Sequence, residues 1–192
     1  MTKDLKEFII PTYNNEMDAE MTSEAFNVIM SGNATEGQIG AYLIALQKNG
    51  INKNHVIGAL KVMQEKMIKV NVPVNSIDTC GTGGDGIGSL NVSTATAFVV
   101  AATGIPIAKH GNKAQTSKCG SADVLEALNI KLIGDPFQLE NCINEINICF
   151  MFAPNHHPAM KYVGKVRQEI GIRTIFNMLG PLLNPGNVQS QI

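Results

Sequence analysis

The stretch DTCGTGGDG at residues 78–86 decides the fold, because it joins a short strand-like run to a helix-forming run through a glycine-rich turn. Gly81, Gly83 and Gly86 have the GxGxxG spacing that lets the main chain come close to an anion. The N-terminus of the helix that follows also favours phosphate. The stretch therefore predicts an anion site, and an ordinary glycine-rich turn stays open as the alternative.

The distribution of acidic residues argues against a dinucleotide site. Such a site needs an Asp or Glu about twenty residues after the glycines to hold a ribose. This chain has neither residue type between Asp85 and Asp123. Asp85 itself would repel a pyrophosphate lying directly over the loop. We therefore interpret the glycines as part of a phosphate site and reject a dinucleotide fold.

Polar residues follow the glycine-rich stretch along the chain. The motif KHGN at 109–112 ends the next predicted strand, and ligands of open parallel sheets bind beyond the C-terminal ends of strands. The segment 86–122 carries three lysines and no carboxylate, a local field that favours a polyanion. Hydroxyl and amide side chains crowd the start of the first predicted helix after the glycines: Ser89, Asn91, Ser93, Thr94 and Thr96.

Local signals predict helices first, and then strands that alternate with helices. Thr22 is the expected cap of a helix at 23–31, and Thr35 with Gln38 forms a capping box for a helix that ends at Gly50. Alternation of strands and helices favours a parallel α/β unit. A sheet of only about three strands is weakly stable alone, so we expect the chain to be the front part of a larger protein. The remaining predicted elements are a helix capped by Asn52, strands at 76–80, 105–108 and 148–152, and helices at 93–103, 121–128, 136–146, 158–170 and 174–179.

Composition excludes several classes of protein. The 192 residues are 44% hydrophobic with a formal net charge of −1, which excludes a disordered chain and disfavours a nucleic-acid partner. No apolar run is long enough for a membrane span, and residues 1–10 show no secretory pattern, so we expect a cytoplasmic protein without a membrane partner. The four cysteines have no CxxC spacing, which favours reduced thiols over an unusual disulfide pair.

Two further sets of residues have competing interpretations. His156 and His157 are adjacent and lack a carboxylate or cysteine at a zinc spacing, so a helix-start role is favoured over a metal site. Arg167 has the planar fork that suits a carboxylate. It is also near Glu169, and on the residues alone a surface ion pair is the better interpretation.

The ordered motifs together resemble the anthranilate phosphoribosyltransferase family. Besides DTCGTGGDG and KHGN, the resemblance covers NVSTATAFVVAATG (91–104), SKCGSADVLEALN (117–129), FAPNHHPAMKYVGKVRQEIGIRTIFN (152–177) and LGPLLNP (179–185). With the helical opening it extends over essentially the whole chain. The pyrimidine nucleoside phosphorylases share the fold but differ around the glycine loop and KHGN.

The resemblance implies an α/β fold of the nucleoside phosphorylase/phosphoribosyltransferase type, with a small all-helical domain and an α/β domain whose central sheet is mostly parallel and here incomplete. The helical domain would span 1–72 and be joined by helices from about 156–180. The α/β domain would begin at 73–155, and 181–192 would return toward it. The implied reaction joins anthranilate to phosphoribosyl pyrophosphate and releases pyrophosphate, with Mg²⁺ and in a homodimer.

The resemblance also implies a role for individual residues. Gly81, Asn112 and Arg167 would face anthranilate, with His110 and Gly180 near them. Ser93 would also bind Mg²⁺. No general base is implied, because positioning the amine against an oxocarbenium-like carbon is the main task. The residues implied to hold phosphoribosyl pyrophosphate are Gly81, Gly84, Asp85, Ser89, Asn91, Val92, Ser93, Thr94, Lys109, His110, Gly111, Asn112, Lys113, Ser117 and Ser121.

The chain departs from the family pattern in sequence and in length. Lys113 stands where Arg is usual, Ala114-Gln115-Thr116 replaces a serine-rich segment, and Cys119 replaces Ser. Family chains are not far short of twice as long and carry an acidic pair for Mg²⁺ in the part without a counterpart here. We therefore expect weak or absent turnover from 192 residues alone. The alternatives are a non-catalytic fragment that binds ligand or dimerises and, less favoured, a pyrimidine nucleoside phosphorylase.

Overall fold

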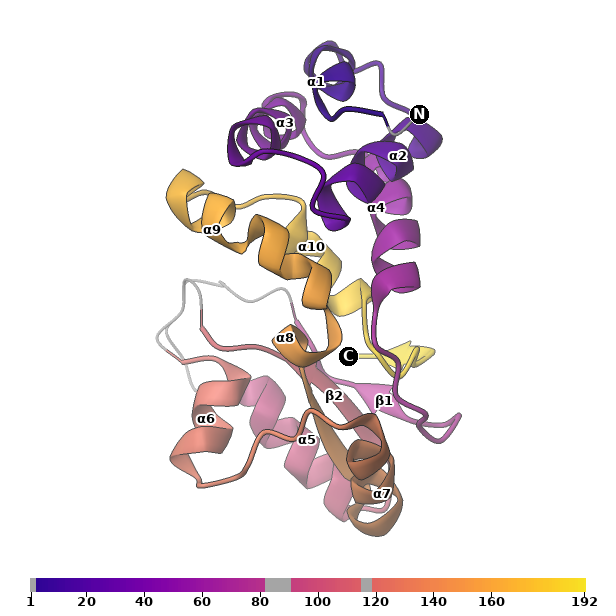
Figure 1. Ribbon diagram of the computed structural model, residues 1–192. Coiled ribbons are helices and arrows are strands. Elements are labelled where there is room, and N and C mark those ends of the chain that lie inside the picture. The colour runs from indigo at the N-terminus through magenta and orange to yellow at the C-terminus, as the bar shows by residue number, and fades with distance from the viewer. Residues whose placement is uncertain (1–2, 82–90, 115–118) are drawn as a thin grey trace. The chain divides into compact units, whose positions relative to one another are not determined.

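Four parallel strands form the sheet that the described part of the chain contains (Figure 1). The computed structural model describes residues 3–81, 91–114 and 119–192. The order in the sheet is β3-β2-β1-β4, and every neighbouring pair is parallel. The strands are β1 (Ile77–Asp78), β2 (Ile107–Gly111), β3 (Ile148–Phe152) and β4 (Ser190–Gln191).

Helices cover both faces of this sheet. Ile107 packs with Ala97 and Ala101 of α5 (Val92–Ala102). The next residue of β2, Ala108, packs with Leu139 and Ile143 of α7 (Pro136–Ile146). Neighbouring residues of a strand point to opposite faces, so α5 and α7 lie on opposite sides of the sheet. The unit also contains α6 (Ser121–Ala127) and α8 (Ala153–His156).

A second compact unit is entirely helical in its regular structure, and it is built from residues 1–66 and 157–182. Phe26 lies at its centre, with ring centroids 6.3 Å from Tyr42 and 5.6 Å from Phe176, so the late helices share a core with the early ones. The sheet unit contains the rest, 67–156 and 183–192. The helices are α1 (Lys6–Tyr13), α2 (Ala19–Met30), α3 (Glu36–Asn49), α4 (Lys53–Lys66), the 3₁₀ turns η1 (Pro158–Met160) and η2 (Gly180–Leu182), α9 (Lys161–Ile170) and α10 (Phe176–Leu179).

The fold class predicted from the sequence is confirmed: a helical N-terminal part precedes an α/β part with a parallel sheet. The capping box of Thr35 and Gln38 is confirmed in α3, as is the cap that Asn52 provides for α4. The helix predicted at 23–31 is α2, and its predicted start was wrong. The helix begins at Ala19 because the carboxylate of Asp18 accepts the N–H of Met21 at 2.8 Å.

Two sheet predictions need correction. The strand expected at 105–108 is β2, which begins at Ile107 and continues to Gly111, so it includes Lys109 and His110 of the KHGN motif that was expected to end it. Among the described residues the sheet has four strands and not about three, because β4 pairs with β1 in the register Ile77↔Ser190. The strand at 148–152 is confirmed as β3.

Three further observations concern the described residues. None of their helices is long and apolar enough to cross a membrane. All four cysteines are free. His156 is buried, and its Nδ1 lies 3.0 Å from the carbonyl oxygen of Ile68. The histidine therefore joins the start of the sheet unit to its last helix.

Candidate functional site

The polar residues that the sequence singles out gather in the sheet unit, where β1 and β2 end and α5 begins. Gly81 follows β1 and is exposed, Lys109, His110 and Gly111 end β2, and Asn91 caps α5. Gly84, Asp85, Ser89 and Ser117 lie outside the described residues. Apart from Arg167, the described members of the predicted set therefore lie at or just after the ends of β1 and β2, and at the starts of α5 and α6.

Lys109 is the central charged group of this edge. Its side chain is buried, with only 2% of the residue exposed. The Nζ atom donates to the hydroxyl of Thr79 at 3.1 Å, and lies 3.4 Å from both the Thr79 carbonyl oxygen and the Ser93 hydroxyl. Burial lowers the pKa of Lys109. The charge of the Asp78 carboxylate opposes this decrease. The hydrogen-bond acceptors of the ammonium among the described residues are neutral oxygens, so a phosphate oxygen would be a stronger acceptor for it.

The N-terminus of α5 faces the same group of atoms. The amide oxygen of Asn91 accepts the main-chain N–H of Thr94 at 3.2 Å and the hydroxyl of Ser93 at 3.1 Å. The hydroxyl of Thr94 is buried and has no hydrogen-bond partner among the described residues. Val92, which lies between them, is 62% exposed. The positive end of the helix dipole thus lies close to a lysine, an arrangement that favours a phosphate ligand.

A buried carboxylate that the sequence analysis did not assign lies beside Lys109. Asp78 is fully buried, and its carboxylate accepts the amide of Asn184 at 2.7 Å and the main-chain N–H of His110 at 3.1 Å. Burial raises the pKa of Asp78, while these two hydrogen bonds oppose that rise. The sequence implied no role for Asn184, because its motif, GPLLNP, indicates only the end of a helix, and no local signal connects it to β1.

The segment after β2 is held by its own polar groups. The carbonyl of Asn112 accepts the N–H of Ala122, and Ser121 begins α6. Gly111 is packed tightly, since a Cβ there would lie 2.7 Å from the ring of Phe150. Lys113, which stands in place of the family's usual Arg, forms an exposed ion pair with Glu126 at 2.9 Å.

Arg167 and Gly180 belong to the helical unit. Arg167 is half-buried on α9, where its Nη2 donates to Asn177 at 3.4 Å and its guanidinium lies over the ring of Phe176 at 5.3 Å. Burial lowers the pKa of Arg167. Its neighbour Glu169 lies 3.8 Å from Lys165. The arginine is therefore packed against an aromatic ring, which orients its planar fork.

The side-chain atoms at this site that could act as ligands of a metal ion are oxygens. Among the described residues, no group of three or more His, Cys, Asp and Glu side chains could hold one. The hydroxyl of Ser93 and the amide oxygen of Asn91 lie 3.1 Å apart. Mg²⁺ is commonly held by one or two protein oxygens together with waters and substrate phosphates. These residues fit such an ion only when the phosphates come with it.

Comparison with known proteins identifies both parts of the chain. The model for the glycosyl transferase family, a/b domain, matches residues 74–192, and that for the glycosyl transferase family, helical bundle domain, matches residues 12–67. A relative from Bradyrhizobium sp. (strain ORS 278), named anthranilate phosphoribosyltransferase, is 52% identical over 176 residues, which are 92% of this chain and 52% of the relative. Another from Persephonella marina, with the same name, is 48% identical over 98% of this chain and 56% of its own length.

Solved structures agree with these sequence matches. The anthranilate phosphoribosyltransferase (TrpD) of Thermus thermophilus has a TM-score of 0.89 and 36% identity over 99% of this chain and 57% of that one. The Saccharomyces cerevisiae enzyme in complex with PRPP and Mg has a TM-score of 0.88 and 28% identity over 97% of this chain and 57% of that one. This chain spans about half the length of the curated relatives it matches. Because an α/β-domain model covers more than half of its residues and a helical-bundle model covers most of the rest, the chain belongs to the glycosyl transferase family that these two models describe.

Proposed function

We propose that the chain belongs to an anthranilate phosphoribosyltransferase, which transfers the phosphoribosyl group of phosphoribosyl pyrophosphate to the amine of anthranilate. The products are N-(5-phosphoribosyl)anthranilate and pyrophosphate. The observation that carries the proposal is the ammonium of Lys109, buried among neutral oxygens beside the N-terminus of α5. The names of the relatives from Bradyrhizobium and Persephonella support it.

The site residues would bind and orient phosphoribosyl pyrophosphate. Lys109 would donate to phosphate oxygens in place of its longer contacts, at 3.4 Å, with the Thr79 carbonyl and the Ser93 hydroxyl, and would keep its bond to the Thr79 hydroxyl. The hydroxyl of Thr94, which is buried without a partner among the described residues, supplies a further hydrogen bond at the same helix end. Gly81, Asn91, Val92, His110, Gly111, Asn112, Lys113 and Ser121, with Gly84, Asp85, Ser89 and Ser117 outside the described residues, complete the proposed set.

Mg²⁺ belongs to the same proposal, and the yeast structure in complex with PRPP and Mg supports it. Ser93 would hold the ion through its hydroxyl, with Asn91 close by. When bound, Mg²⁺ neutralises charge that develops on the departing pyrophosphate. Lys109 stabilises the same charge from the protein side without any proton transfer.

The second substrate, anthranilate, would be bound through its carboxylate and placed by Gly81 and Asn112. Arg167 is the proposed carboxylate partner, because the packing of its guanidinium on Phe176 orients a fork that can make two parallel hydrogen bonds. The yeast structure in complex with 4-fluoroanthranilate supports a ligand of this class. We propose no general base, since the reaction requires mainly that the amine be held against the ribosyl carbon.

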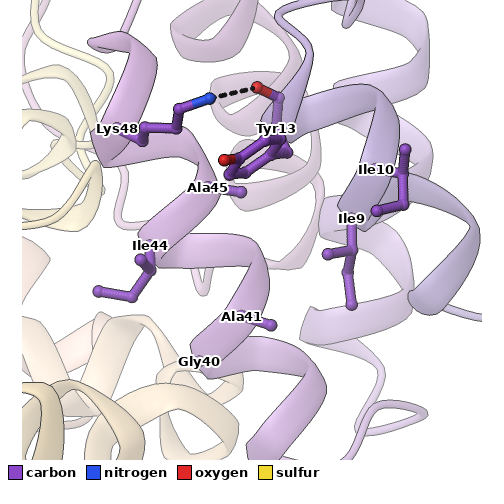
Figure 2. A pocket seen from close by; sticks show the side chains of 8 residues that line it. All are labelled: Ile9, Ile10, Tyr13, Gly40, Ala41, Ile44, Ala45 and Lys48. Atoms are coloured by element: carbon purple, nitrogen blue, oxygen red, sulfur yellow. Dashed lines mark hydrogen bonds between the residues drawn. The ribbon is translucent and has the colours of Figure 1, made fainter.

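A homodimer and a cytoplasmic location complete the proposal. An apolar groove between α1 and α3 of the helical unit supports the homodimer (Figure 2). Ile10, Tyr13 and Ile44 line this groove and are 63%, 51% and 47% exposed, and Lys48 lies over the Tyr13 ring at 3.4 Å. Sedimentation of the Ile44→Asp variant tests it: a dimeric wild type and a monomeric variant are expected, and a monomeric wild type would contradict it.

The function is tested by mixing the full-length protein with anthranilate, phosphoribosyl pyrophosphate and Mg²⁺ and following anthranilate fluorescence. We expect the fluorescence to fall only when all three are present. The same protein is then mixed with thymidine or uridine and phosphate. Cleavage of the nucleoside without loss of anthranilate would replace the proposal with a nucleoside phosphorylase. Calorimetry of the 192-residue chain with phosphoribosyl pyrophosphate shows separately whether this part binds ligand.

A further inference from the structure

Side-chain hydrogen bonds replace the main-chain ladder where β1 ends. The strand β1 stops at Asp78, while β2 continues to Gly111. Where β2 continues beyond the end of β1, the carboxylate of Asp78 accepts the main-chain N–H of His110, and the side-chain amide of Asn184 donates to the main-chain carbonyl of Ala108 at 2.8 Å. Asp78 and Asn184 are themselves joined at 2.7 Å. The two side chains therefore hold the main chain of β2 on both sides of Lys109.

Thr79 fixes the other end of the lysine side chain. Its hydroxyl donates to the carbonyl of Ser93 at 2.9 Å, so its single proton is already used. The same oxygen has a lone pair left, and this accepts from Nζ of Lys109 at 3.1 Å. Thr79 is 3% exposed, so water cannot readily replace this acceptor. The bond to Ser93 also joins β1 to the start of α5.

We propose that Asp78, Thr79 and Asn184 are positioning residues for Lys109, in that they hold its main chain and its ammonium where a phosphate group of the ligand arrives. This inference rests on the proposed function. None of the three has to touch the ligand. Asp78 and Asn184 fix the strand from which the side chain extends, and Thr79 fixes the direction in which it ends. Pre-organisation of this kind lowers the entropic cost of binding a charged ligand.

A purely structural role would make a different prediction. Buried hydrogen bonds between distant segments stabilise the fold wherever they occur, and their loss would lower the melting temperature without a specific effect on the ligand. Asn71, which is exposed, provides a comparison in the same unit for the loss of a hydrogen bond between distant segments. Its main-chain N–H and its side-chain amide both donate to Glu140, at 3.2 and 3.0 Å, far along the chain from Lys109.

The experiment measures binding of phosphoribosyl pyrophosphate with Mg²⁺ by calorimetry, and KM for both substrates, in the full-length protein. Thr79→Val keeps the shape of the side chain and removes the acceptor of Lys109. We expect its dissociation constant and its KM for phosphoribosyl pyrophosphate to rise about tenfold, as for loss of one hydrogen bond to a charged group, with KM for anthranilate unchanged. Thr79→Ser keeps the hydroxyl and should therefore keep the affinity of the wild type. Asp78→Asn and Asn184→Ala should weaken binding in the same way, and Asn71→Ala should lower only the melting temperature.

Each outcome decides between the possibilities. Wild-type affinity in Thr79→Val, or an equal loss in Asn71→Ala, would overturn the positioning role and leave the proposed function standing. A wild type that binds no phosphoribosyl pyrophosphate would overturn both. Thr79→Val changes no charged group, so the inference stays testable even where Asp78→Asn does not fold.

Discussion

The carboxylate of Asp123 accepts the main-chain N–H of Ala114 at 2.8 Å, and the same oxygen accepts that of Gly120 at 2.7 Å. These two hydrogen bonds lower the pKa of Asp123, because they favour its charged form. One side chain near the start of α6 thereby joins both ends of the segment 114–120. Ala114 follows KHGN and Gly120 precedes Ser121, so this carboxylate connects two parts of the proposed phosphate site.

Asp123→Asn is expected to weaken both hydrogen bonds, because a neutral amide oxygen is a poorer acceptor than a carboxylate. The loss should resemble that of a helix cap, about 1 kcal/mol of the free energy of unfolding. Urea denaturation at neutral pH measures it. A variant of unchanged stability would show that the two hydrogen bonds do not hold the segment in solution.

Gly120→Ala should destabilise the same segment for a steric reason. A Cβ at Gly120 would lie 2.4 Å from the nitrogen of Ala114 and 2.6 Å from the oxygen of Asn112, and both are main-chain atoms that cannot rotate away. We expect a loss of about 1–3 kcal/mol, as for overpacking, and weaker binding of phosphoribosyl pyrophosphate. The control is Gly164→Ala in α9, where a Cβ meets nothing within 4 Å. That change should stabilise the protein by about 0.5–1 kcal/mol, since alanine is the better helix former. Equal melting temperatures for the two variants would contradict the steric argument.

His55 makes the stability of the helical unit depend on pH. It is buried, and its Nδ1 accepts the main-chain N–H of Asn52 at 3.2 Å, which only the unprotonated ring nitrogen can do. Burial lowers the pKa of His55 in the folded state. The unfolded chain therefore binds more protons, and stability should fall as the pH drops below about 6.5. Burial lowers the pKa of His156 as well, so the stability of the sheet unit should change with pH in the same direction.

His55→Gln should reduce this pH dependence and keep the cap. Gln38 shows the arrangement in α3, where its side-chain oxygen accepts the N–H of Thr35 at 2.9 Å. Chemical denaturation between about pH 5 and pH 8 measures the slope of stability against pH. A variant with the wild-type slope would assign the effect to other groups, and His156 is the first to examine.

Local sequence signals predicted the elements whose ends depend on neighbouring residues. The capping box of Thr35 and the helix from Pro136 to Ile146 are of this kind, since cap and turn signals lie within four residues of the helix end. The start of α2 was misplaced because two capping residues, Asp18 and Thr22, compete. The hydroxyl of Thr22 donates to the main-chain carbonyl of Asp18 at 2.7 Å, and Asp18 is the residue that caps the helix.

Long-range pairing was beyond the sequence. The strand β4 is two residues long and both are exposed, so no pattern of burial marks it, and its only signal is its pairing with β1. Lys109 was recognised at a strand end, but its burial and its bonds to Thr79 depend on how β1, β2 and α5 come together. The same holds for Asn184, which is 106 residues from Asp78 in the chain.

Lys109→Met should abolish most of the affinity for phosphoribosyl pyrophosphate. Methionine keeps the length and apolar stem of the side chain and removes the charge. We expect KM for phosphoribosyl pyrophosphate to rise about a hundredfold, in line with the loss of a buried charge-assisted contact, with KM for anthranilate nearly unchanged. Lys131→Met, at an exposed position of the same unit, is the control for charge alone. Circular dichroism checks that the variant is folded, and wild-type affinity in a folded variant would remove Lys109 from the site.

Arg167→Lys tests the other substrate and should give the opposite split. Lysine keeps the positive charge but cannot make two parallel hydrogen bonds to a carboxylate, and it loses the stacking of the planar guanidinium on Phe176. We expect KM for anthranilate to rise about tenfold and KM for phosphoribosyl pyrophosphate to stay the same. Lys161→Gln is the matched control, because its ammonium also lies over an aromatic ring, that of Tyr162 at 5.0 Å, at the start of the same helix. If both KM values rise together in Arg167→Lys, or if Lys161→Gln gives the same change, then Arg167 acts through the packing of α9 and not through the carboxylate of anthranilate.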